Sequence, residues 1–597
     1  MLAKAHFCTS YDSTLSDVKS LTQDALELVR KFVQEHDWFL VYDNINIFNK
    51  KADQRGDNTD TMENGTTATI IGGISLGDNG DDRKPGQPLD RLTIDDFKYD
   101  NEHRKKVLLH FIFSVLQRCH PACPSITVPP VPEKTKLIAE KSIHFPLPAM
   151  KIDQSSVEGN LEILRTVMQI SLQLSPEYFN GKYILVAGDN LTVLFHLRMN
   201  LCSLILRTHY GVLGTPGSLA SDIAMLRRKR VRSEKHCFHT ADELLRSKFD
   251  ALVMCLWEEK LEARLEAEDE SMLPRIVEAA EYLCAELSQP TQEYSKQRGT
   301  ANTNAMLFIR DMLVYLELTA AIKCGDVGRI EEVLKTITIM FQATSTKNYG
   351  NQLLRFAYDI RHTWSDVRKD AIFQSWLVNV SGKENAWVPA DLYQEHTNLL
   401  TKVRYAGSGS NRSWKYLELS TSMNVRLYGE IQEKVEEEFG VTFNNNHHST
   451  VSTKEDVSRI MASLKNKNIF RGSNRPTEEV HPVCDLQETG MERLNEEGLY
   501  AFHEILKARR NTAQGTTVDN TVQGTDGDIS ENGKGKDRRI ENDVRVDETL
   551  KQYFKNFAKC CLRSFDSNID DPNDEGASID EAPILDDREV WTESFTK

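Results

Sequence analysis

The chain has 597 residues, of which 40% are hydrophobic and 27% are charged. This length predicts about two to four domains, and this composition is typical of a globular protein with some disordered segments. The formal net charge of −16 argues against a general nucleic-acid binder, because such proteins usually carry a basic excess. The charge is unevenly spread, however, and a basic run at 227–232 leaves room for a local nucleic-acid site.

Cysteine usage and apolar runs bear on the compartment of the protein. Eleven cysteines without a CxxC pair favour a reducing compartment over a disulfide framework. The beginning of the chain lacks the pattern of a signal peptide. The apolar run from Val107 to Phe113 is too short to span a bilayer. We therefore expect an intracellular protein without membrane contact, placed in the nucleus rather than the cytoplasm.

Helical and strand-like patterns alternate over the first 190 residues. Apolar residues at three- and four-residue steps predict a helix over 12–36, and the apolar run that follows predicts a strand around Asp43. Thr67–Ile71 predicts a second strand, so that the two strands form a hairpin with a long polar connection. Beyond the polar segments 51–66 and 76–90, which are expected as loops, the predicted elements are a helix over 103–118, an extended proline-rich segment over 121–150, a helix over 157–173 and a strand that ends at Asp189.

After Asp189 the pattern is almost wholly helical. The helical stretch from 191 to 345 lies between strand-rich segments, which predicts an insertion domain. Residues 510–545 are poor in apolar side chains and predict disorder, with a short helix near 547–564. Further helices are expected over 351–380, 388–404, 421–439 and 453–465.

Three acidic residues stand out because of their positions. Asp43 interrupts an apolar strand, Asp189 closes a second one, and Glu395 lies on the helix over 388–404. A carboxylate on a buried strand is costly unless it is paired or binds a metal. Two strand aspartates and one helical glutamate form the set that two-metal phosphoryl-transfer enzymes need. We therefore predict these three residues as catalytic residues and as ligands of Mg²⁺ or Mn²⁺.

Plainer interpretations are open for each acid. Asp43 could be a turn or edge residue of its strand, and Asp189 could start a turn or cap the following helix. Glu395 could be one more exposed helical acid among the 89 acidic residues of the chain.

Two other motifs carry possible chemistry. The basic run Arg227, Arg228, Lys229, Arg230 and Arg232 is a candidate nucleic-acid-binding segment or nuclear-import signal, and a solvated helix or loop is an equal alternative. The segment Cys119–Cys123 lacks the spacing of a common zinc module. No phosphate-binding loop or dinucleotide fingerprint is present in the sequence, so no small-molecule cofactor is expected.

Several motifs in a fixed order resemble a fungal family of unknown function, the DUF6589 type. The resemblance runs from about residue 38 to about residue 460, and the motifs are Tyr42–Asn46, Gly188–Thr192, Phe195–Asn200, Ala320–Asp326, Asn348–Tyr349, Asn379–Lys383 and Asp391–Asn398. The layout is similar to that of DDE transposases, which have a ribonuclease-H-like core and a helical insertion between the second and third acids. The resemblance thus implies Asp43, Asp189 and Glu395 as metal-binding acids. It implies His196 and His396 as accessory residues near the path of the phosphate.

The resemblance implies an α/β, predominantly helical fold: a ribonuclease-H-like mixed-sheet core with a large helical insertion domain and a disordered C-terminal tail. The expected division is residues 1–190 for the first part of the core, 191–345 for the insertion, 346–470 for the remainder of the core with the third acid, 471–509 for a helical or irregular extension, and 510–597 for a mostly disordered acidic tail.

Two departures from the family pattern bear on activity. Only Val193 and Leu194 separate two motifs that stand further apart in the family, and the chain begins close to the first strand, with no room for an N-terminal DNA-binding domain. We therefore expect a transposon-derived protein in degenerate form, similar to a DDE transposase or nuclease that acts on DNA phosphodiesters. The alternative is a domesticated, non-catalytic helical interaction scaffold or a decayed remnant. DNA is the expected partner. Self-association is compatible with both the enzyme and the scaffold.

Overall fold

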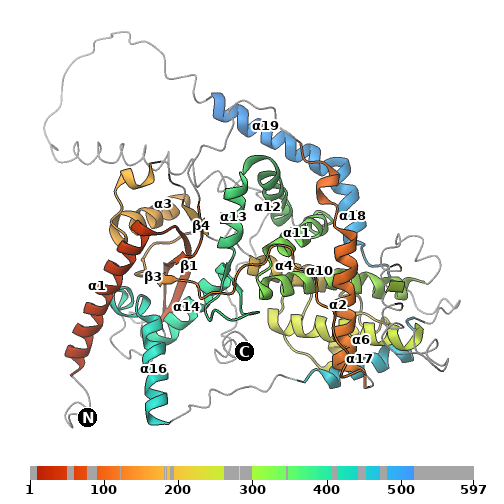
Figure 1. The fold of residues 1–597 in the computed structure, drawn as a ribbon. Helices are drawn as coiled ribbons and strands as arrows, with labels where there is room; N and C mark the ends of the chain where they lie inside the picture. Colours follow the sequence, from red (N-terminus) through yellow and green to blue (C-terminus); the bar gives the residue numbers. More distant parts are fainter. Residues whose placement is uncertain are drawn as a thin grey trace.

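A computed structural model describes residues 10–49, 55, 59–76, 91–121, 123–180, 182, 184–187, 194–260, 278, 281–282, 285, 299–344, 347–406, 413–440, 452–470 and 480–515. Within these residues the chain is mainly helical and carries one four-stranded and one two-stranded sheet (Figure 1). The predominantly helical fold with a small mixed sheet is therefore confirmed. No helix of the described residues combines the length and the apolar character needed to cross a membrane.

The elements follow one another as the sequence patterns indicate. The helices are α1 (Tyr11–Glu35), α2 (Asn101–Cys119), α3 (Val157–Arg165), α4 (Leu194–Thr208), α5 (Leu219–Leu226), α6 (Phe238–Lys260), α10 (Thr300–Cys324), α11 (Val327–Gln342), α12 (Lys347–Tyr358), α13 (Asp366–Ser375), α14 (Ala390–Ala406), α15 (Trp414–Tyr416), α16 (Val425–Phe439), α17 (Lys454–Asn466), α18 (Leu486–Arg493) and α19 (Leu499–Gly515). The strands are β1 (Trp38–Asn49), β2 (Thr61–Gly72), β3 (His144–Pro146), β4 (Leu185–Ala187), β5 (Leu377–Val378) and β6 (Val388–Pro389).

Strand β1 is an inner strand of the larger sheet, whose order is β3-β2-β1-β4. It pairs antiparallel with β2 over its whole length, from Trp38 opposite Gly72 to Asn49 opposite Thr61. It pairs in parallel with the short strand β4, with Val41 opposite Ala187. The predicted hairpin is confirmed, but β2 begins at Thr61, so the prediction of a loop over 61–66 was wrong. This end of the hairpin is largely exposed, and its polar side chains gave no apolar strand signal.

Helices cover both faces of this sheet (Figure 1). Trp38, Leu40 and Tyr42 pack on one face in a cluster with α1 and α3. Phe39 and Val41 pack on the other face with Ala390 and Tyr393. A strand that is covered on both faces is apolar at successive positions, which explains the unbroken apolar run at the start of β1. The second face lies under α14.

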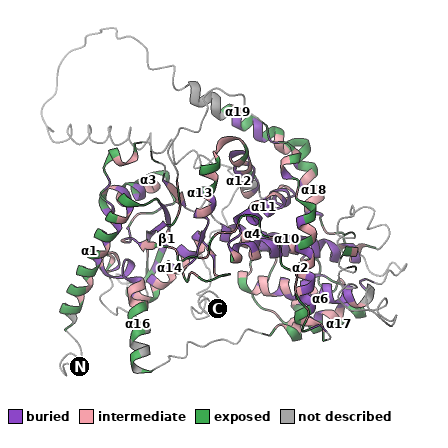
Figure 2. Cartoon of the chain, in the orientation of Figure 1, coloured by how far each residue is buried: buried purple, intermediate pink, exposed green. Residues whose placement is uncertain are grey.

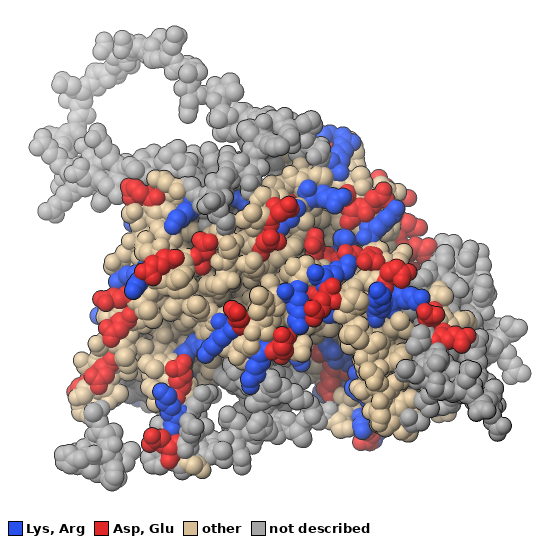
Figure 3. Space-filling model, viewed as in Figure 1, with Lys and Arg blue, Asp and Glu red and all other residues tan. Residues whose placement is uncertain are grey.

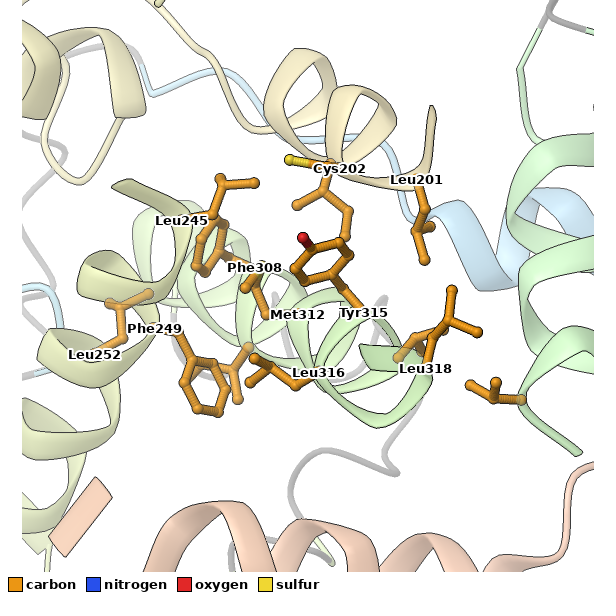
Figure 4. Packing of buried hydrophobic residues seen from close by; sticks show 14 of the residues in the cluster. Leu201, Cys202, Leu245, Phe249, Leu252, Phe308, Met312, Tyr315, Leu316 and Leu318 are labelled. Carbon is orange, nitrogen blue, oxygen red and sulfur yellow. The ribbon is translucent and has the colours of Figure 1, made fainter. Parts of the chain in front are cut away.

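The largest apolar cluster is a helical body centred on α4, α6, α10 and α11 (Figure 4). Buried residues run along most of α10 (Figure 2), as expected for a helix surrounded by other helices. Ile112 of α2 and Ile460 of α17 belong to the same cluster. The helical body therefore includes residues before 191 and after 345. The domain boundaries expected from the sequence stay predictions.

Several helices differ in extent from their sequence patterns. The helix predicted over 157–173 is α3 followed by a π-helical turn at Thr166–Ser171. The helix predicted over 351–380 is divided into α12, a π-helical turn at Asp359–Thr363 and α13. Helix α19 continues to Gly515, past residue 510 at which the tail is expected to begin, and that domain boundary stays a prediction. The rest of that tail and the predicted helix over 547–564 lie outside the described residues.

Two helical glycines offer a matched test of the packing between α11 and α18. A methyl group at Gly490 of α18 would overlap the carbonyl oxygen of Ile339 on α11, whereas one at Gly429 of α16 would meet no atom within 4 Å. We expect Gly490→Ala to destabilise the protein by about 1–3 kcal/mol through overpacking. We expect Gly429→Ala to stabilise its helix by about 0.5–1 kcal/mol, because alanine loses less backbone entropy. Thermal unfolding of both variants measures the contrast, and equal melting temperatures would contradict it.

Candidate functional site

Asp43 lies on β1 at the face covered by α14. Alternate residues of a strand share a face, so Asp43 follows Val41 on the α14 side. The side-chain amide of Asn398 donates a hydrogen bond to Asp43 Oδ2 at 2.9 Å and another to the carbonyl oxygen of Asn44 at 3.1 Å. Asp43 is half-buried. Its carboxylate is thus held by a neutral amide that helix α14 supplies.

A buried polar network continues from this contact beneath the helix. Thr67 and Thr69 project from β2 toward Gln394 and Asn398 of α14, and all four residues are buried. Thr69 Oγ1 donates to Gln394 Oε1 at 2.7 Å, and Gln394 Nε2 donates to Thr67 Oγ1 at 3.0 Å. Thr67 Oγ1 also donates to Asn398 Oδ1. Because the strand residues are two apart and the helix residues are four apart, each pair faces the other element.

Glu395 lies on the same helix and contacts His196 of α4. Nε2 of His196 is 3.3 Å from Glu395 Oε1, and Nδ1 of the same ring is 3.3 Å from Asp391 Oδ2. Asp391 Oδ2 also accepts the backbone N–H of Phe195 at 3.0 Å. The imidazole of His196 therefore bridges two carboxylates that lie one turn apart on α14.

Two of the three predicted acids are tied to helix α14, each through a different partner. Asn398 contacts Asp43, and Glu395 lies three residues earlier on the same helix. Residues three apart on a helix have Cβ atoms about 5–6 Å from each other, so Glu395 and Asn398 are neighbours on α14, although the Glu395 carboxylate contacts His196 and Asp43 contacts Asn398. Asp189 lies outside the described residues. The last described pair of β1 and β4 is Val41 opposite Ala187, two residues before Asp43 and Asp189 respectively.

The two predicted accessory histidines differ in their surroundings. His196 contacts Glu395 directly, as described above. His396 follows Glu395 on α14, and burial, with a smaller contribution from the positive charge of His239, lowers its pKa below the usual value. The accessory role of His396 stays a prediction.

The basic run follows helix α5 and is only partly available to a ligand. Arg228 forms ion pairs with Glu243 of α6 and Asp456 of α17, so its guanidinium joins three helices. The other four predicted nucleic-acid-binding residues have exposed side chains and make no ion pair with any acid of the described chain: Arg227, Lys229, Arg230 and Arg232. Elsewhere, the face in Figure 3 shows Lys and Arg interspersed with Asp and Glu.

A metal centre made only of described residues is not present. No group of three or more His, Cys, Asp or Glu side chains that could hold a metal occurs among the residues that the structure covers, and this includes the segment Cys119–Cys123. The predicted set of Asp43, Asp189 and Glu395 contains a residue outside that search. The carboxylates of Asp43 and Glu395 are the hard oxygen donors that Mg²⁺ and Mn²⁺ prefer.

Sequence reasoning did not assign roles to the polar partners of these acids. The signal was present on α14, where Asp391, Gln394, Glu395 and Asn398 recur at the steps of one helix face. The pattern around Thr67 and Thr69 of β2 predicts only a strand. Their contact with α14 joins residues more than 300 positions apart, and a single sequence does not contain that pairing.

Comparison with known proteins gives one match. The model of a family of unknown function, DUF6589, matches residues 83–194 and 193–448. The two matched segments meet at residues 193 and 194, where the sequence was expected to be short. No curated protein matches the chain. No solved structure matches it either.

Asn398 offers a direct test of the polar network. In Asn398→Ala, Asp43, Thr67 and Gln394 each lose a hydrogen-bond partner, and we expect a loss of about 1–3 kcal/mol of stability because buried polar groups are left unsatisfied. Asn351→Ala, at an exposed position of helix α12, is the control and should change stability by less than about 0.5 kcal/mol. Thermal unfolding compares the two, and an Asn398→Ala protein as stable as the control would show that the network carries little energy.

Proposed function

Because the chain belongs to the DUF6589 family of unknown function, we propose its function from the site itself: a metal-dependent enzyme, in degenerate form, that acts on DNA phosphodiesters and derives from a transposase with a ribonuclease-H-like core. In this proposal Asp43, Asp189 and Glu395 hold Mg²⁺ or Mn²⁺. The observation that carries it is the hydrogen bond from Asn398 to Asp43, since this contact sets α14, and with it Glu395, over β1.

The topology of the larger sheet supports the proposed core. A ribonuclease-H-like core has a mixed sheet in which the first strand lies between an antiparallel second strand and a parallel fourth strand. The order β3-β2-β1-β4, with β2 antiparallel and β4 parallel to β1, is compatible with that arrangement. The proposal also requires a helix that packs on this sheet and carries an acid. Helix α14 packs on the sheet and carries Glu395.

The strand register supports a role for Asp189. Val41 and Ala187 are neighbours in the parallel pair, and each stands two residues before an aspartate. In parallel strands the residues two further along face the same side as these neighbours. We propose that Asp189, which lies outside the described residues, joins Asp43 as a ligand of the same metal centre.

The chain's own residues would prepare such a centre in distinct ways. Asn398 orients the carboxylate of Asp43 by donating to Oδ2, and His196 contacts the carboxylate of Glu395. Divalent cations held by Asp43, Asp189 and Glu395 would supply the Lewis-acid chemistry that activates an attacking oxygen and stabilises a leaving one. The buried network of Thr67, Thr69 and Gln394 keeps the helix that carries Glu395 at a fixed height above the strands.

DNA is the proposed partner of the basic run. Arg227, Lys229, Arg230 and Arg232 are exposed, and such side chains contact phosphates in a sequence-independent and salt-dependent way. A protein that acts on DNA would work in the nucleus. The break in the family match next to Asp189 supports the expectation of a shortened, degenerate catalyst.

Binding of Mn²⁺ to the full chain tests the proposed centre. Free Mn²⁺ gives an electron paramagnetic resonance signal that is lost when the ion binds to a protein. We expect the wild-type protein to decrease this signal in a saturable way, which gives a dissociation constant. Asp43→Asn, Asp189→Asn and Glu395→Gln should each weaken this binding at least about tenfold, because each removes a charged oxygen ligand.

Glu162→Gln is the matched control for this measurement. Glu162 lies on α3, on the opposite face of the sheet, and pairs with Arg165, so its loss should leave Mn²⁺ binding unchanged. A wild-type protein that does not bind Mn²⁺ would refute the metal centre and favour the non-catalytic scaffold. Mn²⁺-dependent nicking of supercoiled DNA by the wild type, absent from Asp43→Asn, would establish that catalysis survives.

A further inference from the structure

Asp391 contacts helix α4 in a manner unlike that of Glu395, the other acid of α14. Its Oδ2 atom accepts the backbone N–H of Phe195 at 3.0 Å and that of His196 at 3.3 Å. The first N–H groups of a helix have no partner within the helix, and a carboxylate that accepts them also interacts favourably with the helix dipole. Asp391 therefore stabilises the beginning of α4 from outside that helix.

The same oxygen contacts the side chain of His196. Nδ1 of His196 is 3.3 Å from Asp391 Oδ2, and Nε2 is 3.3 Å from Glu395 Oε1. Asp391 thus interacts with both the backbone and the ring of His196, which limits the rotation of that ring. The carboxylate of Asp391 is only 12% exposed, so little solvent competes for these contacts.

These contacts connect two packing units. Leu197 and Leu201 of α4 belong to the core of the helical body. Ala390 and Tyr393 of α14 belong to the core on the sheet. Asp391 is therefore placed to transmit the position of α4 to the helix that carries Glu395.

We propose that Asp391 is a positioning residue that holds His196 against Glu395 and so sets the orientation of the Glu395 carboxylate. This inference rests on the proposed function for its consequence, since a carboxylate oriented by a hydrogen-bonded neighbour binds a metal more tightly. Outer partners of this kind typically change metal affinity by about 10- to 100-fold when they are removed. Asp391 itself contacts His196 and not Asp43, so its role is exerted through the imidazole.

The first arm of the test needs no metal. Amide hydrogen exchange of the full-length protein should become about 5- to 30-fold faster at Phe195 and His196 in Asp391→Ala, which is the range expected when a helix cap is lost. Asp391→Asn keeps an acceptor oxygen and should show a smaller change. His196→Asn keeps both backbone contacts to Asp391 and should leave exchange at the start of α4 unchanged. Unchanged exchange in Asp391→Ala would overturn the proposed contact.

The second arm measures Mn²⁺ affinity in the same proteins. Asp391→Ala and His196→Asn should each weaken binding by about 10- to 100-fold, although only the first alters exchange at α4. Asp366→Ala, another acid in the first turn of a helix, is the control, because its side chain is 96% exposed and pairs only locally with Lys369. Wild-type affinity in both variants would overturn the positioning role. Absence of binding in the wild type would instead refute the metal centre, and the exchange arm would still decide the role of Asp391.

Discussion

Helix α14 lies on the sheet through hydrogen bonds as well as through apolar contact, and the arrangement of the candidate site depends on that layer. Thr67, Thr69, Gln394 and Asn398 are buried together between β2 and the helix. A shift of the helix along the strands would leave these groups unsatisfied, at a cost of about 1–3 kcal/mol for each one. Apolar contacts alone tolerate small displacements better, because they are not directional. The network therefore fixes where Glu395 stands relative to Asp43 more tightly than packing would.

The same helix joins the sheet to the helical body. Its apolar residues Ala390 and Tyr393 pack on Phe39 and Val41 of β1, while Asp391 stabilises the first turn of α4. The strand pair β5–β6 leads directly into it, with Val388 opposite Val378. One helix thus meets the sheet along one side and the helical body at its beginning. Any rearrangement of the helical body that moved α4 would act on His196 and, through it, on Glu395.

The sequence predicts those features of the structure that depend on neighbouring residues better than those that depend on residues far apart in the chain. Periodicity located α1 and α2, and the apolar runs located β1 and its hairpin partner, because local burial patterns determine these elements. The exposed end of β2 and the continuation of α19 to Gly515 lacked such a pattern. Asp43 and Glu395 could be singled out as acids in unusual places, but their proximity depends on contacts between β2 and α14 across more than 300 residues. Likewise, nothing local distinguishes Arg228, which forms ion pairs with Glu243 and Asp456, from its exposed neighbours.

Carboxylates that lie close together repel each other, whether or not the protein binds a metal. Carboxylates roughly 6–8 Å apart repel each other by about 2–3 kcal/mol at an effective dielectric constant of about 20. Asp391 and Glu395 lie one turn apart on α14 with His196 between them, and Asp43 accepts a hydrogen bond from Asn398 of the same helix. A divalent cation would both orient and neutralise acids at such positions. The placement of these acids beside an ordered network of amides and hydroxyls is therefore the physical reason to look for metal binding before cleavage.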